Sequence, residues 1–352
     1  MPKDASALKE ALARGAAQGV APALVLLLWS DGGPVLELAN GQADMDTVFD
    51  LASLTKPLAT AALALDLAAD ESLPWHTTLA EAWGQAVPED KAGITVEQLL
   101  CHSAGLPAHR PYYTALLAQA PPSRRGFVKA MLLNEPLEYS PGSKALYSDL
   151  GYMLLGLLLE DYAGWRLEKA VERMYAKLGA EAPRFLPLAS EPVWPLERIA
   201  PCGALPGRPL VHGQVEDENA FALGGVAGHA GLFGTARQAA GVMHALVRAS
   251  QGQGPWPGEL AERLFELDQA TPNSTRTPGF DTPSGVASAA GAKPPQGLVG
   301  HLGFTGVSLW WHAPSNKGAV LLTNRVALGR GNEKIKDFRH GIHNLVWPFL
   351  SL

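Results

Sequence analysis

The sequence predicts an α+β fold, in which an antiparallel sheet built from both ends of the chain is flanked by helices. Three observations predict it. Apolar runs bounded by turn residues lie at 23–38 and again at 307–323, as expected for strands. The chain between them, from about residue 54 to residue 180, carries helical patterns. No repeat of solenoid length is present, so the two ends most simply form one sheet with a helical insertion.

The N-terminal elements are a helix and a hairpin. Apolar residues recur at helical spacing over 5–18. The apolar run 23–29 then meets a Gly-rich turn and a second apolar run at 35–38, which predicts a β-hairpin. Because the first run is unbroken, we expect both of its faces to be covered.

The remaining elements follow in order. A run of Leu, Ala and Thr predicts a strong helix over 54–67, and residues 181–215 are Pro-rich and irregular. Strands are expected over 307–312 and 319–323, before a final helix over 335–346. We expect a single unit, residues 1–352, with an α/β subdomain of approximately 1–60 plus 225–352 and a mainly helical subdomain of approximately 61–224.

Composition excludes several classes of protein. Of the 352 residues, 47% are hydrophobic and 18% charged, enough to bury a large core. A net charge of −6 without a basic block argues against nucleic acid as a partner. No apolar run reaches the roughly 20 residues of a membrane span. Cys101 and Cys202 allow one disulfide at most, and together with the lack of a signal peptide they predict a cytoplasmic protein.

Ser53 and Lys56 are the first candidate pair for chemistry. They stand at i and i+3 at the expected start of a helix, because Pro57 is tolerated only near a helix N-terminus. The helix dipole and burial among leucines would lower the pKa of Lys56, so that it could take a proton from the Ser53 hydroxyl. The alternative is that Ser53 is only a helix cap and Lys56 a solvated lysine, as the same spacing at Ser6 and Lys9 illustrates.

Two further elements carry candidate residues. Tyr147 and Asp149 follow a Ser-Pro-Gly turn, where the phenol could act as a general acid or base and the carboxylate could bind substrate. The alternatives are a core tyrosine and a helix N-cap. His301 and Gly303 precede the strand expected at 307, where a glycine permits close approach of a ligand. His301 could be a polar or cationic group that faces a substrate carboxylate or carbonyl, and the alternative for it is a structural role.

In order and spacing, Ser53-x-x-Lys56, Tyr147-x-Asp149 and His301-x-Gly303 resemble the motifs of the serine β-lactamases and penicillin-binding proteins, most closely the class C branch with its esterases and D-peptidases. The segments 99–107 and 224–233 are similar to segments of the same branch. The resemblance runs from about Ala21 to Trp347.

The resemblance implies a serine hydrolase that acts through a covalent acyl-enzyme. Ser53 would be the nucleophile, Lys56 and Tyr147 would handle the proton, and the backbone N–H groups of Ser53 and Phe304 would form an oxyanion hole. Asp149, His301 and Gly303 would contact the substrate, a small ester, amide, peptide or β-lactam. No metal or cofactor is implied, and the oligomeric state is not predicted.

The sequence departs from the family pattern at three positions. Asp149 replaces an Asn, which indicates a different substrate. Leu302 replaces a Thr, which removes a hydroxyl from the third motif and favours esterase or peptidase chemistry over β-lactam recognition. Glu216 stands where relatives of this branch often have His. Leu302 and the lack of an export signal motivate the rival hypothesis, a catalytically silent binding or sensor protein on the same scaffold.

Overall fold

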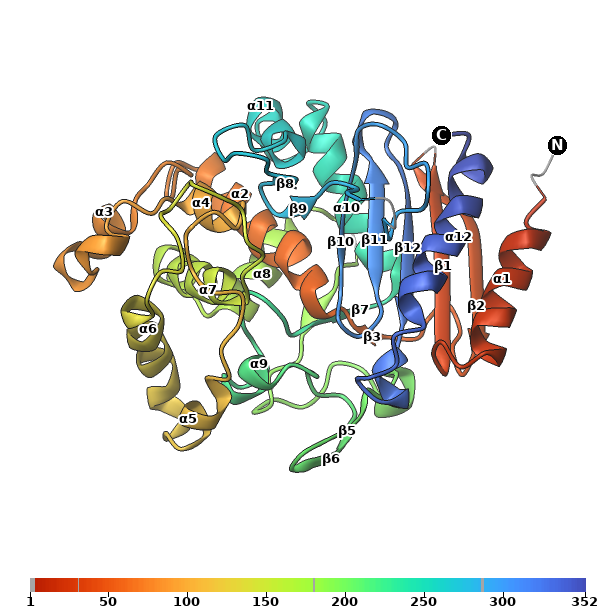
Figure 1. Cartoon of the computed structure of the whole chain (residues 1–352), viewed down its shortest axis with the longest axis horizontal. Coiled ribbons are helices and arrows are strands. Elements are labelled where there is room, and N and C mark those ends of the chain that lie inside the picture. The colour runs from red at the N-terminus through yellow and green to blue at the C-terminus, as the bar shows by residue number, and fades with distance from the viewer. Residues whose placement is uncertain (1–3, 31, 180, 286–287) are drawn as a thin grey trace.

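The computed structural model describes residues 4–30, 32–179, 181–285 and 288–352. Its main element is a seven-stranded antiparallel sheet of order β2-β1-β12-β11-β10-β9-β8 (Figure 1). Strands from both ends of the chain build this sheet, as predicted. The strands are β1 (Ala23–Ser30), β2 (Gly33–Gly41), β8 (Arg276–Thr277), β9 (Phe280–Asp281), β10 (Leu298–Leu302), β11 (Ser308–His312) and β12 (Lys317–Thr323).

Both faces of β1 are buried, which confirms the expectation from its unbroken apolar run. Leu24 and Leu26 point into a core with the helices α1 (Ser6–Ala17) and α12 (Ile335–Leu350), which lie side by side on one face of the sheet (Figure 1). Val25 and Leu27 point into the larger core on the opposite face, where α10 (Ala236–Ser250) packs. Side chains alternate between faces along a strand, so one run of leucines serves two cores.

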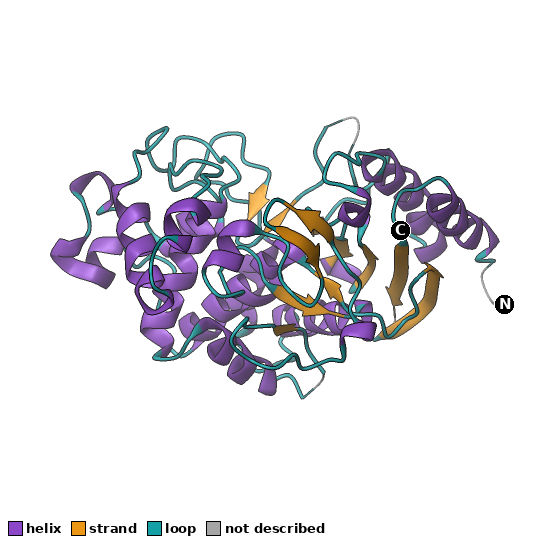
Figure 2. Ribbon diagram, turned by 90° about the horizontal axis from the view of Figure 1, so that it is seen from below, coloured by secondary structure: helices purple, strands orange, loops and turns teal. Residues whose placement is uncertain are grey.

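The remaining helices gather on the far side of the sheet from α1 and α12 (Figure 2). The buried α7 (Asp149–Ala163) contacts four of them and joins them into one core. The helices of this region are α2 (Ala62–Ala69), α3 (Leu79–Trp83), α4 (Val96–Leu100), α5 (Tyr113–Leu117), α6 (Arg124–Asn134), α7 and α8 (Leu167–Ala176), with α9 (Glu218–Ala222) and α11 (Gly258–Glu262) at its edges.

The helix expected over 54–67 is not a single α-helix. A 3₁₀ turn, η1 (Ala52–Leu54), is followed by a π-helical segment, η2 (Lys56–Ala61), and only then by α2. Single π turns inside helices are rare and occur often at functional sites. Here the wider turn contains both Lys56 and Pro57, the residue that lacks a backbone N–H for the helical ladder.

A small three-stranded sheet holds the segment before η1. Its order is β3-β7-β4, made of β3 (Phe49–Asp50), β7 (Leu232–Gly234) and β4 (Arg184–Phe185). The segment expected to be irregular also contains a short hairpin, β5 (Gly203–Leu205) and β6 (Arg208–Val211). These strands are too short to leave a periodic signal in the sequence.

Two further findings concern the chain as a whole. Cys101 and Cys202 are both buried free thiols. Within the described ranges, no helix combines the length and the apolar character that crossing a bilayer requires.

Candidate active site

Ser53 lies in η1, directly after β3, and its side chain remains partly exposed. The residue before it, Ala52, has φ +47°, a left-handed conformation that is uncommon for a residue with a side chain. The Asp50 carboxylate holds this turn by accepting a hydrogen bond of 2.8 Å from the Ala52 N–H. Strained backbone next to a reactive side chain is a frequent property of functional sites.

The Lys56 ammonium is fully buried and has three partners. Its Nζ lies 3.0 Å from the Ser53 Oγ, 3.1 Å from the His229 carbonyl oxygen and 2.7 Å from the Asp149 Oδ1. The contacts with Ser53 and His229 are hydrogen bonds that the ammonium donates, and the contact with Asp149 is an ion pair. The spacing of Ser53 and Lys56 therefore does bring the hydroxyl and the amine into contact.

The charge state of Lys56 differs from the sequence-based expectation. Burial by itself lowers the pKa of Lys56, but the Asp149 carboxylate and the Tyr147 phenol outweigh it and raise that pKa above its ordinary value. The expectation of a lowered pKa was wrong because it considered only the helix dipole and the leucines around Lys56. In the resting state Lys56 is an ammonium that donates to the Ser53 oxygen.

Tyr147 stands next to this pair. Its ring lies under the Lys56 Nζ, 4.7 Å from the ring centroid, and its phenol is within hydrogen-bonding reach of Ser53 and Lys56. Burial raises the pKa of Tyr147, which Lys56 partly offsets, so the phenol is neutral at rest. The buried His102 ring packs against it at 4.7 Å between centroids and also accepts the Ser148 N–H at its Nδ1. His102 thus positions the loop that carries Tyr147.

Asp149 is the first residue of α7 but not its N-cap. Ser148 caps the helix, because its Oγ accepts from the Gly151 N–H at 3.0 Å and donates to the Pro107 carbonyl at 2.6 Å. The Asp149 side chain is free of that task and points to Lys56. The N-cap alternative for Asp149 is therefore wrong.

The third motif lies behind the site. His301 is on β10 and is buried, with its ring centroid 5.8 Å from that of Tyr147. Burial, with Lys56 and Arg276, keeps its pKa well below the usual value, so the imidazole is neutral. Its Nδ1 is 2.7 Å from the Leu302 carbonyl, which can only accept, so Nδ1 carries the hydrogen. His301 is therefore not the cationic group that the sequence suggested as one possibility.

Gly303 packs against Leu51 and Ala52, the two residues before Ser53. A Cβ at this position would lie 3.2 Å from the Cβ of Ala52 and 3.1 Å from the Leu51 carbonyl oxygen, while also colliding with Val307. The glycine therefore permits close approach of the backbone, but the partner is the η1 turn of the chain. Phe304, the next residue, is about half exposed beside the site.

Ser53 opens onto a cavity of about 240 Å³, and neither His301 nor Gly303 is among its described lining residues. Carboxylates dominate its wall. They belong to Asp50, Asp149, Glu216, Asp217 and Glu218, and the other described lining residues are Ala52, Ser53, His109, Val215, Ala230, Phe304 and Arg330.

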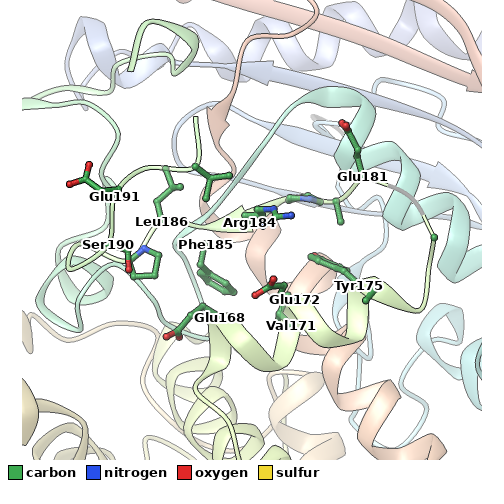
Figure 3. A pocket seen from close by; sticks show the side chains of 16 residues that line it. Glu168, Val171, Glu172, Tyr175, Glu181, Arg184, Phe185, Leu186, Ser190 and Glu191 are labelled. Atoms are coloured by element: carbon green, nitrogen blue, oxygen red, sulfur yellow. The ribbon is translucent and has the colours of Figure 1, made fainter. Parts of the chain in front are cut away.

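Another cavity, of about 600 Å³, lies between α8 and the segment 181–193 (Figure 3). Its described lining residues include Tyr175 and Phe185 but none of the predicted site residues. Because Ser53 and Asp149 line the smaller cavity, we take that cavity as the candidate active site.

The sequence did not single out three groups at this site. Asp50 holds the η1 turn, the His229 carbonyl accepts from Lys56, and Arg330 binds Glu216 and Glu218. Asp50, three residues before Ser53, was the only one with a local signal, since a carboxylate can accept from the backbone two residues on. Arg330 is distant in sequence from its partners and has no such signal.

The fold and this site define a class of protein, the serine hydrolases that use a Ser-x-x-Lys pair. The chain matches the Beta-lactamase family over residues 8–341 and belongs to that family. A relative in Escherichia coli O157:H7, named "Putative D-alanyl-D-alanine carboxypeptidase", is 32% identical over 328 residues, which cover 83% of this chain and 72% of the relative. These matches identify the chain as a serine hydrolase.

Solved structures show the same fold. A penicillin-binding protein homologue from Pyrococcus abyssi has a TM-score of 0.74 at 18% identity, with 99% of this chain and 78% of that chain covered. The hydrolase EstCE1 has a TM-score of 0.70 at 21% identity, and the match covers 96% of this chain and 98% of the EstCE1 chain. The predicted β-lactamase-like fold is therefore confirmed.

Proposed function

We propose that Ser53 is the nucleophile that attacks the carbonyl carbon of a small ester or amide and forms an acyl-enzyme. The observation that carries the proposal is the 3.0 Å contact between the Ser53 Oγ and the Lys56 Nζ at the wall of an open cavity. A nucleophile in contact with a proton-handling group is the arrangement that acyl transfer requires. The Ser53 Oγ–carbon bond forms, and the bond to the leaving group breaks.

Lys56 and Tyr147 take up the proton that Ser53 loses as it attacks. In the active form, this pair holds one proton fewer than in the resting state. The deprotonated member, either the phenol or the amine, accepts the Ser53 proton. The same proton passes to the leaving oxygen or nitrogen. In deacylation, water attacks the acyl carbonyl with the same proton transfers, and the Ser53 hydroxyl is restored. Because Asp149 stabilises the protonated pair, activity should rise with pH.

Two backbone N–H groups, of Ser53 and Phe304, are proposed as the oxyanion hole. Phe304 lines the same cavity as Ser53, and Gly303 lets its segment approach η1 closely. Donors fixed in the fold can stabilise the negative oxygen without reorganisation during the reaction.

The size of the cavity supports a small acyl group. Its volume of about 240 Å³ is below the range of pockets that enclose drug-sized ligands. The relative from E. coli carries the name of a carboxypeptidase, which makes a D-amino acid peptide the second candidate substrate. Leu302 lacks the hydroxyl of the family motif, and we therefore place small esters and amides first.

Burst kinetics with p-nitrophenyl acetate test this proposal. We expect rapid release of about one equivalent of p-nitrophenol per enzyme, followed by slower turnover, and loss of both phases in Ser53→Ala. The absence of any Ser53-dependent release from this ester and from a panel of D-amino acid peptides would instead support the silent binding protein on the same scaffold.

A further inference from the structure

We infer that the substrate of this site carries a positive charge close to the scissile carbonyl, as in an α-amino acid ester or amide with a free ammonium group. The inference rests on the proposed function, because it assigns a substrate class to the cavity beside Ser53. Its basis is the balance of charged side chains around that cavity.

Five carboxylates line the cavity, and three of them remain accessible. The side chains of Asp149, Asp217 and Glu218 keep a fifth to a quarter of their surface exposed. Glu216 is almost fully buried beside them. A surplus of negative charge in a cleft raises the local concentration of cations and repels anions.

The basic groups at or beside this wall are already engaged, and His229 is one of them, since its Nε2 lies 2.8 Å from the Asp217 Oδ1. Arg330 donates from Nε to Glu216 at 2.6 Å and forms a two-point contact with Glu218 at 2.8 and 2.7 Å. One guanidinium thus faces two carboxylates, which leaves a negative charge in excess. Lys56 has no exposed surface, donates hydrogen bonds to Ser53 and His229, and forms an ion pair with Asp149.

Asp50 adds only part of a negative charge at neutral pH, because its carboxyl group is partly protonated there. Its carboxylate accepts from the N–H groups of Ala52 and Glu216, at 2.8 and 2.7 Å, and within the described ranges it forms no ion pair. Burial raises the pKa of Asp50 to about 7, and the neighbouring Glu216 and Asp217 carboxylates add to that rise. Mutual repulsion of this kind is what a crowded, negatively charged wall produces.

Groups that could hold a substrate carboxylate are correspondingly scarce. His301 is neutral and presents its Nε2 as an acceptor, and Leu302 has no hydroxyl. His109 is the remaining basic side chain among the described lining residues; it is half exposed and lies 3.9 Å from Asp149. The wall therefore suits an ammonium group better than a carboxylate.

Three small amides that share a propanamide frame and differ in one substituent test the inference. Alaninamide carries an ammonium, isobutyramide replaces it by a methyl group, and methylmalonamate replaces it by a carboxylate. An α-amine has a pKa of about 8, so it is largely protonated at pH 7. Each amide is measured as a competitor of p-nitrophenyl acetate hydrolysis, which reports binding whether or not the amide itself is cleaved.

We expect alaninamide to compete on the order of tenfold more strongly than isobutyramide, and methylmalonamate to be the weakest. In Glu218→Gln, which removes one charge from the wall, the gap between alaninamide and isobutyramide should narrow. Glu172→Gln is the matched control, since Glu172 lies on α8 away from the site and pairs with Lys169, and it should leave the ranking unchanged.

The outcomes separate this inference from the proposed function. Equal competition by the three amides, competition by none of them, or preference for methylmalonamate overturns the charge preference while Ser53-dependent ester hydrolysis stands. If ester hydrolysis does not depend on Ser53, the proposed function fails and the inference falls with it.

Discussion

At the scale of single residues, Asp149 influences the protonation of Lys56 and Tyr147, the pair that we propose handles the proton of Ser53. Its carboxylate lies 2.7 Å from the Lys56 Nζ and raises the pKa of Lys56, and it adds to the rise that burial causes in the pKa of Tyr147. In the proposed mechanism, this pair must lose one proton before it can activate Ser53. The proposed mechanism therefore predicts that this carboxylate sets the pH at which the enzyme becomes active.

We expect Asp149→Asn to move the rising limb of the kcat/KM profile to lower pH. Removing the negative neighbour favours the deprotonated form of the Lys56–Tyr147 pair, so its pKa falls. The measurement is the pH dependence of p-nitrophenyl acetate hydrolysis for both proteins. An unchanged limb, or a shift to higher pH, would show that Asp149 does not set the charge state of the pair.

A second prediction concerns Tyr147. Tyr147→Phe keeps the ring that packs on His102 but removes the phenol, and we expect it to lower turnover on the order of 10² or more, the usual contribution of general acid–base catalysis. Circular dichroism and thermal unfolding serve as controls for the fold. Turnover close to that of the wild type would remove Tyr147 from the proton path.

At this scale the sequence predicted the neighbours but not their charges. The motif resemblance placed Ser53, Lys56, Tyr147 and Asp149 together, and the structure brings their side chains into one cluster. Their roles stay a prediction until tested. The raised pKa of Lys56 depends on a contact between residues far apart in the chain, which no local pattern encodes.

At the scale of elements, a close contact between α7 and the loop before β7 fixes the back of the site. The Cα of Gly156 on α7 would lie 2.9 Å from a Cβ placed at Gly228. The two backbones can approach so closely because both positions are glycine. Gly228 precedes His229, whose carbonyl accepts from Lys56, so helix packing and the Lys56 position are coupled.

We expect Gly228→Ala to destabilise the protein by about 1–3 kcal/mol, the usual cost of overpacking, and to lower turnover by displacing the His229 carbonyl. Gly241→Ala is the matched control. Gly241 lies inside α10, and no described atom outside its own stretch of helix lies within 4 Å of a Cβ placed there, so Ala should stabilise the helix by roughly 0.5–1 kcal/mol. Urea unfolding measures both, and equal effects of the two substitutions would contradict the packing argument.

The elements that the sequence predicted well have strong periodic signals, such as α1, the β1–β2 hairpin and α12. The π-helical start of the helix after Ser53 was missed, because leucine and alanine are compatible with either geometry. Tertiary contacts decide between the α- and π-helical geometries, and one of them is the hydrogen bond from the Thr60 hydroxyl to the Gly228 carbonyl.

On the scale of the whole molecule, the sheet joins the two ends of the chain and the site lies where the sheet meets the helices. β3 and β7 pair beside the η1 turn, and the Asp50 carboxylate links this turn to the Glu216 backbone. The division into two subdomains, predicted from patterning, remains our proposal. Burial of Asp50 at this junction links folding to pH.

We expect Asp50 to make the wild type less stable as the pH rises from about 4 to about 8. Its pKa is about 7 in the folded chain and about 3.9 when unfolded, so the folded state holds the extra proton over this range and loses that advantage above it. Asp50→Asn removes the dependence. The free energy of unfolding of the variant relative to the wild type should therefore increase with pH.

Denaturant unfolding across this pH range measures the difference. Asn has one acceptor oxygen, so the variant also loses one of the hydrogen bonds from the Ala52 and Glu216 N–H groups. This loss lowers the free energy of unfolding of the variant by the same amount at every pH and leaves its pH dependence unchanged. Parallel curves for the two proteins would show that Asp50 does not titrate with folding.

The most direct test of the account is covalent labelling with a fluorophosphonate, read by intact mass and peptide mapping. We predict one adduct per wild-type chain, located on Ser53, and none on Ser53→Ala. Ser6→Ala serves as the matched control, because Ser6 has the same Ser-x-x-Lys spacing on the exposed surface of α1 and should label like the wild type. An adduct on another residue, or an unchanged adduct on Ser53→Ala, would contradict the account.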